Sequence, residues 1–441
     1  MQVSANTMQS SHYVTFNSDI CSGCANCIKA CPTKAIRLYK DNHACITDKC
    51  IRCGECLRVC PTGAISTTTY ELEALQKDKV SIALVSPVLY SQFKGVMPND
   101  ILLALTKIGF HNAMDVSYYI ETYFYAVEEY LAENRITGRS PWPLISQVCP
   151  VVIRLIAYQF PDLLPHLMPI MRPLSHHAKG TRERISREYR IKGDAVTLYH
   201  ITPCQAKLIT SMSSFSQEYS LVDRTMGIKD VYAQITGRLN QMKKTGIENL
   251  REESEPQNIS ESCLFWGISG GEIAGIKSNK TLAVSGLRET ITYLEKIEMG
   301  LFKDIEYIEF RTCPEGCIGG ALTAVDKFIA KNTVLKMLRK FNPKPLIPRD
   351  KVVLPDKSGW GLSDITQNEL QRIFGVYKEH ISIKQLKEIE KILEQLHGKD
   401  CAACGAPDCR TFAEDVVMGK AVLNDCIMLR KREIDKILEH K

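Results

Sequence analysis

Short apolar runs alternate with amphipathic stretches from residue 79 to about residue 346. The runs are rich in β-branched residues, which predicts strands, whereas the stretches between them have the spacing of amphipathic helices. Strands that alternate with helices are typical of an α/β domain built on mainly parallel strands. The runs that predict strands are residues 81–85, 144–148, 196–201 and 305–311, with two further candidates at 264–268 and 281–285.

A different pattern marks the C-terminal part of the chain. Residues 342–361 are rich in proline and lysine, which predicts a linker or an extended strap across the surface. Apolar side chains then recur at helical spacing from Ile383 to Leu396, which predicts a helix. We expect this helix to lead into a small C-terminal domain.

No apolar run is long enough to cross a bilayer. The longest runs, such as Val80–Leu89, fall well short of the roughly 20 residues that a spanning helix needs. The N-terminal sequence MQVSANTMQSSHYV lacks the basic region and the apolar core of a signal peptide. The chain is therefore expected in the cytoplasm.

Length and composition narrow the class of protein. The 441 residues exceed what one hydrophobic core usually organises, and about 150 residues per domain gives roughly three domains. Hydrophobic residues make up 44% and charged residues 24%, which excludes a disordered or collagen-like chain. The net charge of +6 is far from the balance of a nucleic-acid-binding protein.

The number and grouping of the cysteines indicate what kind of protein this is. The 18 cysteines are grouped: nine lie between Cys21 and Cys60, five between Cys149 and Cys317, and four between Cys401 and Cys426. Disulfide scaffolds are short and secreted, whereas cysteine groups at short fixed spacing in a chain without a signal peptide indicate metal sites.

The first group contains two copies of one motif. CSGCANCIKACP (21–32) and CIRCGECLRVCP (50–61) both have the spacing of bacterial ferredoxins, in which the fourth cysteine of each copy binds the other copy's cluster. A zinc site is the alternative, although zinc takes four ligands in two pairs. Cys45 falls outside the motif and is expected to pack as a small apolar residue. The predicted 4Fe-4S ligand sets are Cys21, Cys24, Cys27 and Cys60, and Cys50, Cys53, Cys56 and Cys31.

Three predicted strands of the central domain end at a cysteine, namely Cys149, Cys204 and Cys313, and Cys317 follows four residues later. In open α/β sheets the ligand site lies outside the carboxyl ends of the strands, so these cysteines are expected to converge. Proline follows Cys149 and Cys313, which suits the first position of a helix, whose N-terminus stabilises an anionic cluster. The alternative is that they are unrelated buried cysteines.

These segments carry a resemblance. SQVCP (146–150), TPCQAK (202–207) and RTCPEGCIGG (311–320) resemble the three signature segments of iron-only (FeFe) hydrogenases, and the double ferredoxin motif often precedes that domain. The resemblance implies a two-lobed α/β domain of mainly parallel sheets flanked by helices. It also implies a di-iron subcluster with CO, cyanide and azadithiolate, bridged by Cys317 to a cubane and receiving a hydrogen bond from Lys207. The implied cubane ligands are Cys149, Cys204, Cys313 and Cys317.

Two other segments fit the same implied site. Ser86 and Pro87 follow the first strand of the domain, and the glycine-rich segment with Ser269, Gly270 and Gly271 would let backbone approach the di-iron unit. Cys263, just before that segment, has no matching role and is expected in the core.

The departures from the family pattern bear on activity. Val148 stands where catalytic members have a cysteine that passes protons to the azadithiolate, and an aliphatic side chain cannot do so. No proton-relay glutamate could be aligned within residues 118–129. This pattern resembles the sensory branches of the family. Four further differences are Thr202 and Arg311 in place of methionines, Thr210 in place of an acid and Val152 in place of a tryptophan.

The C-terminal cysteines Cys401, Cys404, Cys409 and Cys426 form a fourth predicted 4Fe-4S site. One continuous helix from Cys409 to Cys426 would separate them by about 25 Å, so the helix must break, most simply at Gly419. The segment resembles the 4Fe-4S domain of corrinoid iron-sulfur proteins and of the B subunit of Rnf-type complexes. Zinc is the alternative metal.

The sequence thus predicts a cytoplasmic iron-sulfur protein that interconverts protons and H₂ slowly at an H-cluster, for H₂ or redox sensing. Its expected partner is a ferredoxin-like or signalling redox protein. Two alternatives are a non-enzymatic relay or sensor without the di-iron unit and a hydrogenase-like iron-sulfur assembly factor. The expected parts are a tail (1–13), an α+β ferredoxin domain (14–70), the H-cluster domain (79–345), a linker (346–380) and a small α-helical iron-sulfur domain (381–441).

Overall fold

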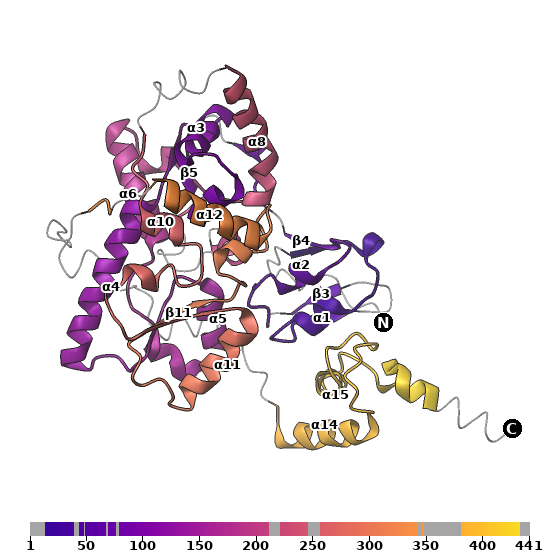
Figure 1. The fold of residues 1–441 in the computed structure, drawn as a ribbon. Helices are drawn as coiled ribbons and strands as arrows, with labels where there is room; N and C mark the ends of the chain where they lie inside the picture. The colour runs from indigo at the N-terminus through magenta and orange to yellow at the C-terminus, as the bar shows by residue number, and fades with distance from the viewer. Residues whose placement is uncertain are drawn as a thin grey trace. The chain divides into compact units, whose positions relative to one another are not determined.

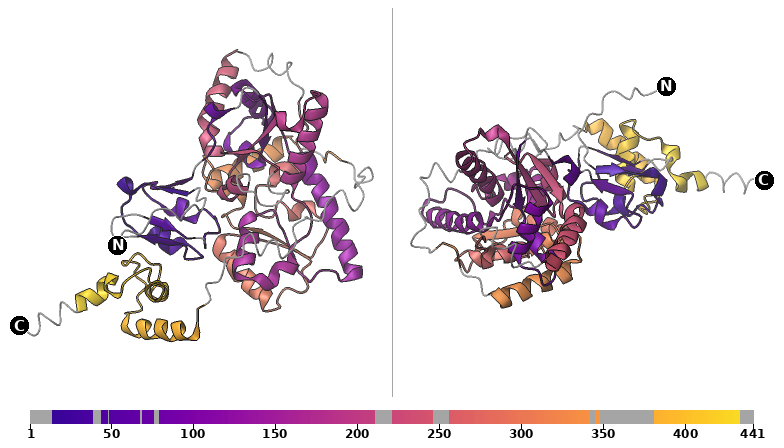
Figure 2. Two further views of the ribbon diagram at one scale, coloured as in Figure 1. Left: turned by 180° about the vertical axis from the view of Figure 1, so that it is seen from behind. Right: turned by 90° about the horizontal axis from the view of Figure 1, so that it is seen from above.

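The computed structural model describes residues 14–38, 44–47, 49–67, 69–75, 79–210, 221–245, 256–341, 345–347 and 381–432 (Figures 1 and 2). The chain divides into two compact units. One contains residues 1–68 and 376–441, and the other contains residues 69–375. Most of the linker expected at 346–380 lies outside the described residues.

The larger unit contains two parallel sheets, which confirms the predicted mainly parallel α/β architecture. The first sheet has the order β6-β5-β8-β9, and its central pair is in register from Val80 opposite Val196 to Val85 opposite Ile201. All residues of β8 are buried because helices and loops cover both faces, as is usual for parallel strands. Its strands are β5 (Val80–Val85), β6 (Asn112–Met114), β8 (Val196–Thr202) and β9 (Arg224–Gly227).

The second sheet is smaller and has the order β10-β11-β7. β11 lies in the middle, fully buried, and pairs in parallel with both neighbours. The two sheets account for the two lobes expected from the resemblance. The strands are β7 (Leu144–Ile145), β10 (Thr281–Ser285) and β11 (Tyr307–Arg311).

Helices surround the sheets of this unit, and one large buried cluster of apolar side chains spans both lobes. α3 packs against α8, and the 21-residue α4 packs against α6 and α10. The helices are α3 (Pro98–Ile108), α4 (Ser117–Thr137), α5 (Pro150–Gln159), α6 (Pro173–Glu188), α7 (Gln205–Thr210), α8 (Ile228–Thr245), α10 (Glu261–Phe265), α11 (Leu287–Glu298) and α12 (Lys327–Phe341).

Some sequence-based expectations for this unit were wrong. The candidate strand at 264–268 is the end of α10 and a turn, because Ser260 caps the N–H of Cys263 and starts a helix. The strand expected at 144–148 stops at Ile145, and no helix begins at Pro314. β6 and β9 were not predicted, since three or four residues give too short a pattern.

The smaller unit holds the ferredoxin-type part and the C-terminal helices. The ferredoxin-type part has two antiparallel pairs, β1 with β4 and β2 with β3, and two short helices. Its elements are β1 (Val14–Phe16), α1 (Asn26–Ala30), β2 (Ile36–Leu38), β3 (Ala44–Ile46), α2 (Glu55–Val59) and β4 (Ile65–Thr67).

The C-terminal part confirms the predicted helix and the predicted break. α14 (Ile383–Gln395) begins at Ser382, which forms a capping box with Gln385, and it packs against α15 (Cys409–Val417). α15 stops before Gly419, whose φ of 71° turns the chain back toward Cys426.

Arg182 on α6 fixes the edge of the first sheet. Its guanidinium donates to the carbonyl oxygens of Gly193 (2.9 Å), Val196 (2.7 Å) and Leu221 (3.2 Å) and to the carboxylate of Asp223 (2.7 Å). Asp223 in turn accepts the backbone N–H of Leu198 at 2.7 Å.

We therefore predict that Arg182→Met lowers the free energy of unfolding of this unit by about 2–3 kcal/mol, because the acceptors are left without their charged donor. Arg187→Met, an exposed position on the same helix, should change stability by less than about 0.5 kcal/mol. Urea unfolding followed by circular dichroism checks both, and equal effects would contradict the role of Arg182.

Candidate metal centres

The central cysteines lie where strands of the two sheets end. Cys149 is the N-cap of α5, four residues after β7, and Cys204 stands between β8 and α7. Cys313 follows β11, and Cys317 begins a short 3-10 turn. The strand ends belong to different sheets, so the cysteine segments meet between the two lobes.

Backbone contacts hold these segments together. The N–H of Leu322 donates to the carbonyl of Pro203 at 3.0 Å, which joins the segment after Cys317 to the segment before Cys204. Gly320 is required there, because a Cβ atom would come within 2.3 Å of the Pro203 oxygen. The Sγ of Cys149 lies 3.6 Å from the hydroxyl of Thr312, next to Cys313.

The thiols also influence one another electrostatically. Burial raises the pKa of Cys204, Lys207 opposes the rise, and Cys149 and Cys317 add to it. Burial likewise raises the pKa of Cys317, while Arg311 and Lys207 lower it. The structure therefore brings Cys149, Cys204 and Cys317 together beside two cations.

Arg311 supplies a test of whether an anionic cluster fits. Its side chain is 1% exposed, and its Nη2 donates to Glu272 at 2.7 Å while its Nε lies 3.4 Å from Glu309. Nη1 is buried and has no hydrogen-bond partner among the described residues. Burial alone would lower the pKa of Arg311, but Glu272, Glu309, Cys317 and Cys149 raise it well above its usual value. A buried donor beside the thiols suits an anionic iron-sulfur cluster.

A pocket of the larger unit is lined by Val148, the residue before Cys149, while none of the four cysteines is among its lining residues. Ser86, Pro87 and Lys207, which the resemblance places around the di-iron unit, all line it as well. The donors there suit an anionic ligand. The other lining residues that bear on its chemistry are Arg172, His177, His200 and Trp266.

Both histidines of this pocket are held neutral. Burial lowers the pKa of His177 to about 3, with help from the charge of Arg184. Burial also lowers the pKa of His200 to about 3, with help from Lys207. The Nδ1 of His200 lies 3.2 Å from the carbonyl of Leu84, and its Nε2 is buried without a partner among the described residues.

The glycine-rich segment lies against the Cys313–Cys317 turn rather than around this pocket. The N–H of Ser269 donates to the carbonyl of Glu315 at 3.1 Å. A Cβ atom on Gly316 would meet the Ser269 nitrogen at 2.5 Å, and one on Gly271 would meet the Phe265 oxygen at 2.1 Å. Ser269 therefore lies against the turn, Gly271 lies against Phe265 of its own segment, and neither they nor Gly270 are among the residues that line the pocket.

Sequence reasoning missed a buried network behind the cysteines. Glu272 is fully buried and accepts hydrogen bonds from Ser146 (2.7 Å), Tyr307 (2.5 Å) and Tyr123 (3.2 Å) besides Arg311. The signal available was two acidic residues, Glu272 after the glycines and Glu309 inside an apolar strand.

Glu309 has its own set of donors. Its carboxylate accepts the backbone N–H groups of Gly270 (3.3 Å), Glu272 (3.0 Å) and Ile273 (3.2 Å). Burial raises the pKa of Glu309 to about 7, although Arg311 opposes this rise. The strand β11 thereby anchors the glycine-rich segment.

In the ferredoxin-type part, the thiols of one expected ligand set, which contains Cys53, lie near one another. Burial, opposed by a backbone hydrogen bond at Glu55, raises the pKa of Cys53, and the nearby thiols of Cys50, Cys31 and Cys56 raise it further. Cys31 belongs to the first copy of the motif, and its proximity to these thiols suits the expected exchange of the fourth ligand between the two copies. For the other set, Cys21 and Cys24 lie near Cys27 and raise its pKa after burial does.

Backbone donors point at several of these sulfur atoms. The N–H of Ala35 lies 3.2 Å from the Sγ of Cys31. At Cys60 burial raises the pKa, but hydrogen bonds from Thr62, Ile65 and Ala64 outweigh it and lower the pKa below the usual value. Such donors favour the thiolate that iron requires, so the residues fit clusters.

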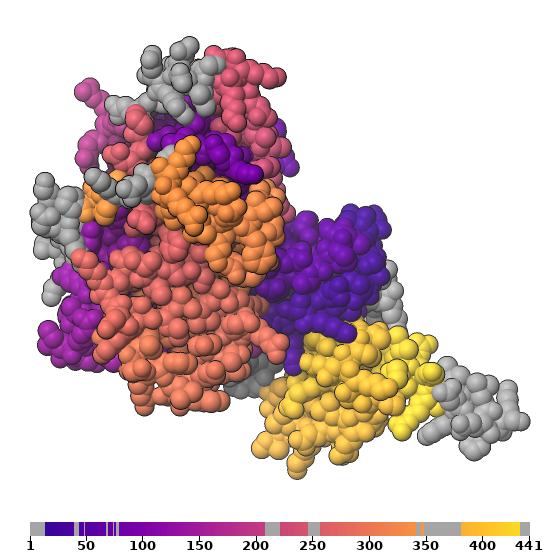
Figure 3. Space-filling model, viewed as in Figure 1, coloured from indigo at the N-terminus to yellow at the C-terminus, as the bar shows by residue number. Residues whose placement is uncertain are grey.

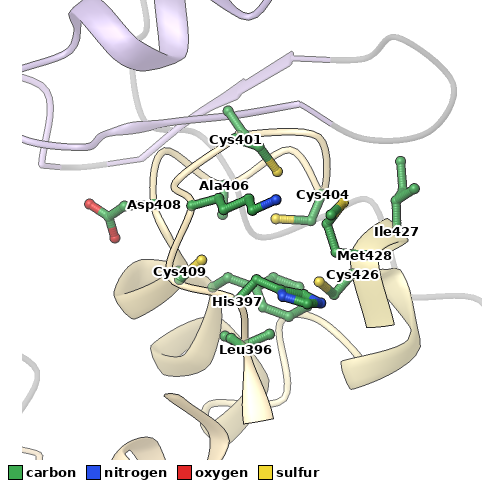
Figure 4. A pocket seen from close by; sticks show the side chains of 13 residues that line it. Leu396, His397, Cys401, Cys404, Ala406, Asp408, Cys409, Cys426, Ile427 and Met428 are labelled. Carbon is green, nitrogen blue, oxygen red and sulfur yellow. The ribbon is translucent and has the colours of Figure 1, made fainter. Parts of the chain in front are cut away.

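The C-terminal cysteines line one pocket (Figure 4). The sulfur atoms of Cys401, Cys404, Cys409 and Cys426 face a common space, and Phe412 is among the residues that line the pocket. Burial raises the pKa of Cys404, with further contributions from Cys426 and Cys401. The arrangement fits one four-thiolate cluster.

The two remaining cysteines differ in burial, because Cys263 is buried and Cys45 is only partly buried. Cys263 is buried in the core of the larger unit, where its Sγ lies 3.4 Å from the carboxylate of Asp115. Cys45 lies in β3 opposite Arg37. Among the described residues, no three His, Cys, Asp or Glu side chains stand close enough to hold a single metal ion.

Comparison with known families agrees with this geometry. Residues 79–277 match the family model "iron only hydrogenase large subunit, C-terminal domain". Residues 13–61 match a 4Fe-4S dicluster domain, and residues 396–428 match an Fe-S cluster domain. Over these ranges the chain is similar to FeFe-hydrogenases and, before that domain, to ferredoxins with two 4Fe-4S clusters. The hydrogenase match ends before Cys313 and Cys317.

Solved FeFe-hydrogenases are distant from this hydrogenase-like chain. A structure of HydA1 from Chlamydomonas reinhardtii has 15% sequence identity and a TM-score of 0.46, and the match covers 63% of this chain and 89% of that one. A structure on the oxygen inactivation of an FeFe-hydrogenase has 13% identity and a TM-score of 0.45, covering 63% and 94%. Likenesses this distant say nothing of what the chain does. None of the helices in the described ranges has the length and apolar character of a membrane span.

The position of Arg311 leads to a prediction for the hydrogenase-like domain. Arg311→Met should lower the reduction potential of the cluster expected at Cys149, Cys204, Cys313 and Cys317 by roughly 60 mV or more, equivalent to tenfold for one electron. The reason is that a cation beside the cluster stabilises its more negative reduced state. A redox titration followed by electron paramagnetic resonance (EPR) measures the shift.

Arg135→Met is the matched control, since Arg135 forms an ion pair with Glu306 and has no cysteine among the groups that shift its pKa. In the Arg135→Met variant, the reduction potential of the same cluster should stay within about 10 mV of the wild-type value. Equal shifts in both variants would show that only net charge matters.

Proposed function

We propose that this protein is an FeFe-hydrogenase-type oxidoreductase that interconverts protons and H₂ slowly and reports H₂ or redox state to a partner. The observation that carries the proposal is the pocket lined by Ser86, Pro87 and Lys207, and by Val148, the residue before Cys149. A cluster-only electron carrier has no need of a pocket with these donors at a cysteine segment. When bound, the di-iron unit would supply the site at which 2H⁺ + 2e⁻ ⇌ H₂ takes place.

The residues of the chain have separate tasks in this proposal. Cys149, Cys204, Cys313 and Cys317 would hold the cubane, and Cys317 would also bridge to the di-iron unit. Lys207 would donate a hydrogen bond to an anionic ligand in the pocket. Ser86 and Pro87 would shape the wall, while Ser269, Gly270 and Gly271 would support the turn that carries Cys317.

In this proposal, the pocket lacks side chains that could pass protons to the di-iron unit. Val148 lines the pocket and is 5% exposed, so it offers neither a proton nor room for a water chain. Glu121, the buried acid within residues 118–129, accepts the N–H groups of Leu346 (2.8 Å) and Ile347 (3.0 Å). That carboxylate is engaged in holding backbone, which supports slow turnover.

The electron-transfer groups are complete in this proposal. The ferredoxin domain would carry two 4Fe-4S clusters and the C-terminal domain one, so electrons would pass between the H-cluster and a redox or signalling partner. A cytoplasmic location suits such clusters. Val148 also favours a second candidate, a relay or sensor that keeps the cubane but lacks the di-iron unit.

Infrared spectroscopy separates these candidates. Protein matured with the hydrogenase assembly enzymes should show CO and cyanide bands if the pocket holds the di-iron unit. If protein with a full complement of cubane iron lacks these bands, the hydrogenase proposal is wrong. The relay or sensor without the di-iron unit would then be the better explanation.

Val148→Cys tests the missing proton donor. In matured protein it should raise hydrogen evolution roughly tenfold to a hundredfold, the lower part of what general acid catalysis contributes, because a thiol in the pocket can pass a proton. A thiol and an isopropyl group have similar bulk, so the packing should survive. Gas chromatography of evolved H₂ gives the measurement.

Val151→Cys on α5 is the matched control, because Val151 is equally buried and does not line the pocket. It should leave the rate unchanged. A correctly matured Val148→Cys variant with wild-type activity would place the limitation elsewhere, at Arg311 or Thr202.

Cys426→Ala tests the C-terminal site. It should remove about four of roughly sixteen irons from anaerobically reconstituted protein, because each cubane needs its full set of thiolates. Cys45→Ala should remove none. Iron and acid-labile sulfide analysis measures both, and zinc in place of iron would overturn the assignment.

A further inference from the structure

The C-terminal iron-sulfur part is built onto the ferredoxin-type part within the smaller unit (Figure 3). The backbone N–H of Leu38, at the end of β2, donates to the carbonyl of Gly405 at 2.9 Å. Gly405 directly follows Cys404. The docking is thus made by the loop that carries the proposed C-terminal ligands and not by a distant part of the domain.

Charged contacts flank this backbone bond. Arg37 binds the carboxylate of Asp415 with both Nε (2.5 Å) and Nη2 (3.3 Å), and both side chains are mostly buried. Arg37 also donates to the carbonyl of Lys34 at 2.6 Å, which fixes its orientation. Lys34 itself pairs with Asp408 at 2.6 Å. A two-pronged, largely buried pair of this kind specifies geometry, unlike an exposed one.

Apolar packing brings the ligand loops of the two parts together. Ala402, between Cys401 and Cys404, is 5% exposed and packs into a cluster with Ile28 and Ile36. The partly buried members of the same cluster include Cys27, Cys31 and Cys56. These cysteines belong to both expected ferredoxin ligand sets, so the C-terminal ligand loop packs into the same apolar cluster as members of both sets.

Gly405 shows that the fit is close. Its φ of 84° is in the left-handed region, and a Cβ atom would come within 1.7 Å of the Leu38 oxygen and 2.8 Å of the Leu38 carbonyl carbon. The obstacle is backbone, which cannot swing away. Gly419, in the same domain with a φ of 71°, has nothing within 4 Å of its Cβ position.

We propose that the C-terminal cluster exchanges electrons directly with the ferredoxin clusters through this docked surface. This inference rests on the proposed clusters at both sites, with Cys401, Cys404, Cys409 and Cys426 as the C-terminal ligands. One electron leaves one reduced 4Fe-4S cluster, which becomes oxidised, and enters an oxidised neighbour, which becomes reduced; no bond or proton changes place. A low-potential one-electron carrier would supply or accept the electron at the C-terminal domain.

The test is EPR spectroscopy of the full chain, reduced with dithionite after anaerobic reconstitution. Electron spins on neighbouring reduced clusters broaden each other's signals and speed their relaxation. The spectrum of Cys426→Ala gives the ferredoxin clusters alone. We expect the wild-type spectrum to differ from the sum of that spectrum and an isolated C-terminal cluster.

Gly405→Ala should abolish this interaction while leaving the iron content unchanged, and Gly419→Ala should keep it. Hydrogen exchange gives a second readout, because the Leu38 amide should be protected in wild type and Gly419→Ala and exchange at least tenfold faster in Gly405→Ala. If Gly405→Ala loses iron, Asp415→Asn replaces it, since it weakens the Arg37 pair and leaves the ligand loop intact.

A wild-type spectrum equal to the sum of independent clusters would overturn the inference while leaving the proposed clusters in place. An interaction that survives in Gly405→Ala, after the Leu38 amide has lost its protection, would overturn it as well. Absence of the C-terminal cluster from iron analysis of the wild type would instead count against the proposed function.

Discussion

The buried carboxylate of Glu272 is the point on which the central site depends. It accepts hydrogen bonds from Ser146, three residues before Cys149, and from Tyr307 and Arg311 on the strand that leads to Cys313. A single fully buried charge thus joins the segments that carry three of the four central cysteines. Removing one partner of such a buried pair typically costs about 3–5 kcal/mol, so the arrangement strongly resists change.

The hydrogen bonds and ion pairs of Glu272 also determine which charged group lies near the central thiols. Arg311 is buried beside Glu272 and Glu309, which compensate its charge, and its Nη1 has no hydrogen-bond partner among the described residues. Cys317 and Cys149 are near enough to raise its pKa. A methionine at this position would supply bulk and no charge. The presence of arginine instead of methionine at position 311 therefore depends on Glu272 and Glu309, and it places a positive charge near the proposed cubane.

Cysteine spacing predicted the composition of the sites well, because the iron-sulfur motifs are local and strict. Short apolar runs likewise predicted β5, β8 and β11, whose buried residues form continuous runs, and also β10, in which Val284 is the buried residue. The pattern misled at residues 264–268, where a single capping side chain, Ser260, determines the local structure. It also could not reveal that Glu272 and Arg311 meet, since 39 residues separate them and only the pairing of β10 with β11 brings their segments together.

In the proposed function, the described residues provide more groups for electron transfer than for proton transfer. In the smaller unit a backbone N–H points at the Sγ of Cys31, and Ala402 of the C-terminal loop packs into one apolar cluster with Ile28 and Ile36 of the ferredoxin-type part. The pocket lined by Ser86, Pro87 and Lys207, by contrast, contains an aliphatic Val148 and two histidines that burial keeps neutral. Fast turnover requires both kinds of transfer at comparable rates. A site whose electrons equilibrate quickly and whose protons move slowly holds a redox state long enough for a partner to sense it.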